Sequence, residues 1–208
     1  MPHMFKQVLE KTVSEKAPGP SATFSVFHVL HAIELIAEKS RGRSKLAEYL
    51  HVGEGAVRTI IGRLKDAGLV STSKAGCSLT NKGLRLWKEY RSIFNKVEIG
   101  KNELTLTDYN FAILIKNRGH KVRSGVEQRD AAVMAGAKGA TTIMLKEGRM
   151  VIPSVSNNVP ADFPKAANQI VTLLEPEEND AIVIGSAHSL GKAEYGTLAA
   201  AWTLLDDC

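Results

Sequence analysis

Basic, hydroxyl and small side chains are concentrated between residues 41 and 74 of this 208-residue chain. Arg58 and Thr59 fall on the face of an expected helix that its apolar residues leave exposed, where a guanidinium and a hydroxyl can hydrogen-bond to base edges. Gly55 and Ala56 precede them and are small enough to let a groove wall approach the helix. This combination favours recognition of DNA through hydrogen bonds over any bond-making chemistry.

A second group of residues in the same segment is suited to phosphate oxygens. Ser44 and Lys45 stand at the expected start of the preceding helix, where a hydroxyl, a charge and unpaired amides attract anions. Arg63 lies further along the exposed face, and Lys74 lies in a turn between two expected strands. The residues expected to contact double-stranded DNA are therefore Arg43, Ser44, Lys45, Gly55, Ala56, Arg58, Thr59, Arg63 and Lys74.

Hydrophobic spacing predicts the helix that holds the central residues of this set. Over Glu54–Ala67, Val57, Ile60, Ile61 and Leu64 recur at intervals of three and four and form one apolar stripe. The stripe must face a core, which leaves the polar and small residues on the outer side.

Capping and turn residues predict the neighbours of that helix. Gly68 ends it, as a residue able to adopt the left-handed conformation, and two short strands over 69–72 and 77–80 follow as a hairpin. The remaining expected elements are an apolar helix ending near Glu38 (capped by Ser21 or Thr23), a helix over 45–50 (capped by Ser44), and a helix to about Phe94 (capped by Thr80).

Three stretches of this segment resemble the winged helix-turn-helix family. Residues 46–58, LAEYLHVGEGAVR, resemble its two-helix unit, and residues 63–70, RLKDAGLV, resemble the exit from its recognition helix into the wing. Residues 79–83, LTNKG, resemble the step into the last helix of many bacterial and archaeal repressors. The resemblance implies a DNA-binding module, and the whole chain looks like an archaeal transcriptional regulator with an uncharacterised second domain.

The formal net charge of +5 is divided unevenly along the chain. Residues 1–100 hold 16 Lys and Arg against 9 Asp and Glu, a net of +7, whereas residues 101–208 hold 11 against 13, a net of −2. A basic half joined to a mildly acidic one indicates that the basic half meets a polyanion. The polar stretch 95–102 marks the boundary, so we expect a winged-helix domain over 1–98 and a second domain over 103–208.

The order of elements beyond that boundary predicts an α+β domain. The expected elements are a strand over 109–115 with a short partner at 103–107, a helix over 126–135, a hairpin over 140–153, a helix over 163–174, a strand over 181–185 and a final helix over 192–205. This order favours a mainly antiparallel sheet with helices on one face.

Two loops of the second half combine side chains that suit an anion. The candidate ligand-binding residues are Arg118, His120, Lys121 and Arg123 in the first loop, Arg129 on the helix that follows it, and Ser186, His188 and Lys192 in the glycine-rich second loop. If the loops converge, they frame a pocket for a phosphate- or carboxylate-bearing metabolite at a helix N-terminus. If they do not, they form solvated surface or a further DNA contact.

Other chemistries are not favoured. Five residues separate Gly185 from Gly191, and Ala193 stands where a phosphate-binding loop needs Ser or Thr, so we expect no nucleotide hydrolysis and no catalytic residue. His28, His31 and Glu34 share one helix face without further ligands, so we expect no metal and no cofactor.

Cysteine content and hydropathy limit the protein class. Cys77 and Cys208 are too few for a disulfide framework, which fits a reducing cytoplasm. No apolar run reaches the roughly 18–20 residues that span a bilayer. Residues 1–6 lack the pattern of a signal peptide, so we expect neither membrane insertion nor secretion.

These observations favour a transcription regulator that binds DNA as a homodimer, because a two-fold protein axis matches paired half-sites. The small apolar residues of 191–202 suit packing on their own sheet or on a second subunit, and the second domain would dimerise and sense a metabolite. One alternative is a metabolic enzyme, a small-molecule kinase or synthase, fused to a winged helix. Another is a winged helix used only in a protein assembly, which predicts no salt-dependent affinity for DNA.

Overall fold

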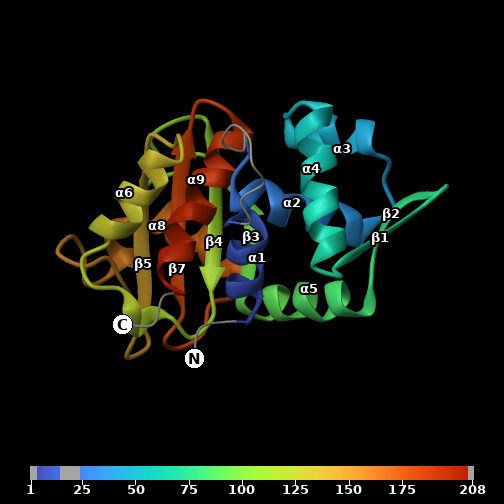
Figure 1. The fold of residues 1–208 in the computed structure, drawn as a ribbon. Helices are drawn as coiled ribbons and strands as arrows, with labels where there is room; N and C mark the ends of the chain where they lie inside the picture. The colour runs from blue at the N-terminus through green and yellow to red at the C-terminus, as the bar shows by residue number, and fades with distance from the viewer. Residues whose placement is uncertain (1–3, 15–23, 206–208) are drawn as a thin grey trace. The chain divides into compact units, whose positions relative to one another are not determined.

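The computed structural model describes residues 4–14 and 24–205 (Figure 1). The chain divides into two compact units, with the boundary between Arg91 and Ser92. None of the helices in the described ranges is long and apolar enough to cross a membrane.

The first unit has the element order of a winged helix-turn-helix. Its elements are α1 (Met4–Ser14), α2 (Val26–Glu38), α3 (Arg43–Leu50), α4 (Glu54–Asp66), β1 (Val70–Ser73), β2 (Gly76–Leu79) and α5 (Asn81–Ile93). Helices α3 and α4 form the helix-turn-helix, and the antiparallel hairpin β1–β2 forms the wing. This part of the fold prediction is confirmed.

The predicted apolar stripe holds α4 in place. Val57, Ile60, Ile61 and Leu64 are all buried, and Leu46 of α3 is buried with them. Full burial of a side chain of this size contributes about 1.5–3 kcal/mol. The stripe therefore fixes the rotation of α4 about its axis, which decides which residues stay exposed.

Two predicted helix boundaries are confirmed and one is wrong. Gly68 follows α4 with φ +70°, and the Thr80 hydroxyl oxygen accepts a hydrogen bond from the Gly83 amide at 3.1 Å, which caps α5. Ser44 does not cap α3, because the helix begins at Arg43, two residues before the expected start, and Ser44 is its second residue; the extended Gly42 precedes it.

Helix α2 begins after Ser25, whose backbone N–H donates to Nδ1 of His28 at 3.1 Å. The alternative caps, Ser21 and Thr23, lie outside the described residues, as do residues 15–20 and Cys208.

The wing is tied to the helices through a third extended segment. The Arg41 and Cys77 backbones form an antiparallel bridge, with N–O distances of 3.3 and 2.9 Å. Gly76, at φ +118°, lies so close that a Cβ atom there would be 2.8 Å from the Arg41 carbonyl. Glycine at this position therefore lets the wing pack against the entry to α3.

The second unit is built on a five-stranded antiparallel sheet with β7 in its centre. The strands lie in the order β3 (Phe94–Glu98), β4 (Tyr109–Ile115), β7 (Ala181–Ala187), β5 (Gly139–Lys146) and β6 (Arg149–Val151). The helical segments are η1 (Gly119–Lys121), α6 (Val126–Met134), α7 (Val159–Asp162), α8 (Pro164–Leu174) and α9 (Leu190–Thr203).

The α+β class with an antiparallel sheet is confirmed, but the helices cover both faces of the sheet rather than one. Ile184 of β7 shares a core with Ile170 of α8. The next residue, Gly185, faces α9, where a Cβ atom would lie 2.2 Å from the Thr197 hydroxyl oxygen. Because neighbouring strand residues point to opposite faces, α8 and α9 lie on opposite sides (Figure 1). Every residue of β7 is buried, as expected for a strand covered on both faces.

Strand β3 corrects the expected domain boundary. Residues 94–98 were expected as a helix end and a linker, but they pair with β4 from Phe94–Ile115 to Glu98–Phe111. They take the place of the partner strand expected at 103–107. Phe94 is the only fully buried residue of β3, so this edge strand has little apolar alternation to reveal it.

Candidate nucleic-acid interface

A basic hollow of about 780 Å³ lies between the start of α3, the exposed face of α4 and the wing. Four cationic residues line it: Arg43 from α3, Arg58 and Lys65 from α4, and Lys74 from the turn of the wing. All four are exposed, and no acidic residue is among the described residues that line the hollow. The arrangement concentrates positive charge where three elements meet.

The N-terminus of α3 opens into this hollow. Gly42, Arg43 and Ser44 line it, and Gly42 provides no side chain to cap the helix. The first amides of a helix have no partner within the helix and carry partial positive charge. The first amides of α3 and the side chains of Arg43 and Ser44 can therefore all donate hydrogen bonds to an anion.

The outer face of α4 is shaped for close approach. A Cβ atom added at Gly55 or Gly62 would meet nothing within 4 Å. Arg58 and Thr59 are exposed, and the Thr59 hydroxyl donates to the Gly55 carbonyl at 3.1 Å, so its oxygen can still accept a hydrogen bond. Steric openness and hydrogen-bonding groups thus coincide on one helix face, as the sequence predicted.

Lys65 is a member of this surface that sequence reasoning missed. It stands seven residues after Arg58 and three after Gly62, so all three share the face of α4 that borders the hollow. That spacing was the available signal.

Arg63 has a structural role in place of the phosphate contact predicted for it. Its guanidinium donates to the carbonyl oxygens of Val13 and Thr12, in the last turn of α1, and lies 5.3 Å from the centre of the Phe24 ring. The side chain is half-buried. The end of α1 attracts this arginine because its last carbonyl groups have no partners within the helix.

Lys45 shares its charge with a neighbour on α3. Its ammonium donates to Glu48 at 2.7 Å, and this hydrogen bond raises the pKa of Lys45 and lowers that of Glu48. Both side chains are fully exposed, so water screens the pair. Lys45 does not line the hollow, and its predicted phosphate contact remains a prediction.

Cys77 lies at the base of the hollow. Burial raises the pKa of its thiol, and the nearby charges of Arg43 and Lys65 only partly oppose that effect. The thiol is therefore a neutral, packed group that joins β2 to the floor of this surface.

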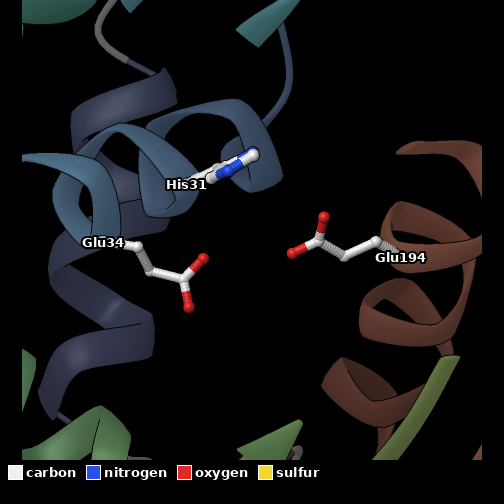
Figure 2. Close-up of side chains that lie close together, drawn as sticks. All are labelled: His31, Glu34 and Glu194. Atoms are coloured by element: carbon white, nitrogen blue, oxygen red, sulfur yellow. The ribbon is translucent and has the colours of Figure 1, made fainter. Parts of the chain in front are cut away.

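Helix α2 carries His28, His31 and Glu34, whose spacing places them on one face. His28 Nδ1 accepts the Ser25 amide, and burial lowers the pKa of this imidazole. Figure 2 shows His31 and Glu34 leaving the same side of α2, as their spacing predicts. Glu194, also drawn there, belongs to α9 of the second unit, where it pairs with Lys96.

The two anion-binding loops predicted in the second unit do not converge. Strands β4 and β7 pair from Tyr109–Ala187 to Ile115–Ala181. The loop after Ile115 therefore lies at the start of β7, and the loop after Ala187 lies at its far end. At about 3.3 Å per residue, some 20 Å of strand separates them. Arg118, His120, Lys121 and Arg123 cannot share one small pocket with His188 and Lys192.

The first loop is organised by the segment just before β7. The Gly119 amide donates to the Asn179 carbonyl at 2.6 Å, the His120 amide donates to Asn179 Oδ1 at 2.9 Å, and the Asn117 amide donates to Asp180 Oδ1 at 2.8 Å. A Cβ atom at Gly119 would lie 3.0 Å from the Asn179 carbonyl oxygen. These contacts explain why the loop contains Gly119 and why Asn179 and Asp180 stand opposite it: they hold the loop backbone in place.

Ser186 is a buried structural residue and does not line an anion pocket. Its hydroxyl donates to Asn110 Oδ1 at 2.7 Å and accepts the Leu106 amide at 3.0 Å. It is only 2% exposed. His188 and Lys192 remain exposed around the start of α9, and Arg129 lies exposed in the first turns of α6.

Comparisons with known proteins agree with this architecture. A family model described as "PH0730-like, N-terminal domain" matches residues 28–85, and the domain of unknown function DUF4443 matches residues 106–204. A solved structure, the hypothetical protein PH0730 from Pyrococcus horikoshii OT3, is 28% identical, with a TM-score of 0.69 over 87% of this chain and 92% of that chain. This chain has the PH0730 fold.

A second solved structure shows much less likeness. Wild-type ZitR from Lactococcus lactis is 23% identical over 42% of this chain and 67% of its own, with a TM-score of 0.31. No curated protein matches the sequence.

Proposed function

We propose that the protein is a DNA-binding transcription regulator, in which α4 enters the major groove while the wing and the start of α3 contact the flanking phosphates. The observation that carries this proposal is the hollow lined by Arg43, Arg58, Lys65 and Lys74 without an acidic residue among the described ones. Phosphate contacts fix the position of a protein on DNA, and base contacts specify the sequence.

The roles of the four cations follow from their elements. Arg58 precedes the middle of α4 on its open face, next to Gly55 and Gly62, where a helix can approach base edges. Arg43 begins α3, and Lys74 lies in the turn of the wing, so these two suit phosphates on either side. Lys65 lies seven residues, or two helical turns, beyond Arg58 on the same face of α4. It is therefore suited to contact the DNA backbone next to the bases that Arg58 contacts.

We propose that the second unit is a binding and association module and not an enzyme. The polar residues Asn110, Asn117, Asp180 and Ser186 hold loops and strands together through the hydrogen bonds described above. An antiparallel sheet with α8 on one face and α9 on the other is a suitable scaffold for a homodimer that binds a small anion. A two-fold dimer would present two copies of α4 to paired half-sites.

The test is DNA affinity measured by fluorescence anisotropy on a pool of mixed-sequence duplexes, followed by selection of tight-binding sequences. Arg58→Ala should weaken binding to a selected sequence by roughly 5–150-fold, which corresponds to about 1–3 kcal/mol for a lost base contact. Lys65→Ala should weaken all sequences alike. Lys88→Ala is the matched control, since Lys88 is exposed on α5 and does not line the hollow. Equal affinity for the native protein and Arg58→Ala would refute the proposed role of α4.

A further inference from the structure

A separate hollow in the second unit opens at the N-terminus of α6. It has a volume of about 340 Å³, within the range of small-molecule sites. Ser124, Gly125, Arg129 and Thr142 line it, so it is formed by the start of α6 and by β5. None of these residues belongs to the DNA-binding surface.

Thr142 supplies the observation that points to a ligand. The residue is 3% exposed, and its buried Oγ1 has no hydrogen-bond partner among the described residues. Leaving a buried hydroxyl unpaired destabilises a fold, and such a group needs an explanation. Thr142 lines the hollow beside Gly125: a Cβ atom placed on Gly125 would lie 3.4 Å from the Thr142 Cβ and 3.6 Å from its hydroxyl oxygen.

The helix terminus supplies donors at the same place. Gly125 precedes α6 with φ +77° and has no side chain to accept the first amides. Val126 N–H lies 3.4 Å from the Ser124 hydroxyl, which is a weak contact, and the Glu127 and Gln128 amides follow. Helix α6 has nine residues, and its N-terminus carries partial positive charge.

Arg129 adds a full charge at the rim. Of the described residues that line the hollow, only Arg129 is charged. It now pairs with Asp130 beside it, with Nη2 at 2.9 Å from the carboxylate, and both side chains are more than half exposed. An exposed pair of this kind is weak, so the guanidinium can turn to a ligand at little cost.

The remaining walls define what else the ligand carries. Val126 and Val155 line the hollow and are 45% and 68% exposed. Exposed apolar walls around a donor cluster favour a molecule with one anionic group and a compact apolar body.

We propose that this hollow binds a small metabolite through a phosphate or carboxylate group. The anionic oxygens accept from the first amides of α6, from the Thr142 hydroxyl and from Arg129, while the apolar body lies against Val126 and Val155. This inference rests on the binding role proposed above for the second unit, but its test is separate from that of DNA recognition, because binding of the molecule is measured without DNA.

The experiment is an amide NMR titration of the full chain with phenyl phosphate, and then with benzoate and inorganic phosphate. The Glu127 and Gln128 resonances should shift saturably, and the aromatic probe that binds more tightly identifies the preferred anionic group. Either aromatic probe should bind at least 3-fold more tightly than inorganic phosphate because of the apolar walls. Shifts that do not saturate, or that avoid the start of α6, would overturn the proposal.

Three variants separate a binding role from a packing role. Thr142→Val keeps the shape of the side chain and removes the hydroxyl, so it should weaken the preferred probe at least 3-fold while raising the melting temperature. Arg129→Gln should weaken it at least 5-fold, and Arg149→Gln, an exposed site on β6, should leave it unchanged. An unchanged Kd in both Thr142→Val and Arg129→Gln would overturn the site. If Thr142→Val does not fold, the Arg129→Gln result decides.

Discussion

The guanidinium of Arg63, on α4, donates a hydrogen bond to the carbonyl oxygen of Val13 in the last turn of α1. It also lies over the Phe24 ring. This arginine therefore connects α1 to the helix that we propose binds in the major groove. Its positive charge interacts with carbonyl groups and an aromatic ring of the first unit itself.

Arg63→Ala should lower the free energy of unfolding by about 1–3 kcal/mol, because the carbonyl groups at the end of α1 lose a charged donor. Urea unfolding measures this loss. The folded fraction of the variant should keep its DNA affinity within about 2-fold. A variant of native stability with strongly reduced DNA affinity would show that Arg63 contacts DNA instead.

A substitution at Gly62 tests whether the open face of α4 is the face that contacts DNA. Gly62→Leu meets nothing within 4 Å at its Cβ and exchanges glycine for a better helix former, so the free energy of unfolding should rise by up to about 1 kcal/mol. The larger side chain should nevertheless reduce DNA affinity at least 10-fold by blocking the groove. Gly191→Leu, at another open glycine but in the second unit, is the matched control. Undiminished affinity in Gly62→Leu would place the DNA elsewhere.

A substitution at Gly83 tests the close packing at the junction between the wing and α5. A Cβ atom there would lie 2.2 Å from the Leu69 carbonyl oxygen, which also accepts the Thr80 amide at 3.0 Å. Gly83→Ala should therefore lower the free energy of unfolding by roughly 1–3 kcal/mol through overpacking. Gly191→Ala should have a much smaller effect in the same thermal scan, and equal melting temperatures for the two variants would contradict the close contact.

His28 links stability to pH. Burial lowers its pKa in the folded chain below the unfolded value of about 6.5, so the unfolded chain binds more protons between those two values. The contribution to stability is complete above pH of about 6.5 and is lost as the pH falls through the folded pKa. Protonation also removes the Nδ1 acceptor of the Ser25 amide. His28→Gln keeps an acceptor at this position and should flatten that part of the pH profile in urea unfolding. A profile unchanged by this substitution would assign the pH dependence to other groups.

Local patterns predicted much of this fold. The apolar stripe of α4 and Gly68 gave the recognition helix and its end, and Glu147-Gly148 gave the hairpin turn, where both residues have positive φ. These features depend on residues close in sequence, so periodicity and turn chemistry are enough to reveal them.

The misses depend on contacts between distant residues. The role of Arg63 requires knowing that the end of α1 lies beside α4, and the role of Ser186 requires its buried partner Asn110. The separation of the two predicted anion-binding loops follows from the register of β4 on β7, which the sequence does not reveal. Strand β3 is an edge strand with one fully buried residue, too few for an alternating pattern.

The salt dependence of DNA binding is the most direct test of the central claim. If Arg43, Arg58, Lys65 and Lys74 meet DNA, the logarithm of the association constant should fall linearly with the logarithm of salt concentration. The slope should be about −0.9 for each phosphate neutralised. Lys65→Ala should make the slope less steep by about 1, and Lys88→Ala should leave it unchanged. A slope near zero in the native protein, or the same slope in Lys65→Ala, would contradict the assignment of this surface to DNA.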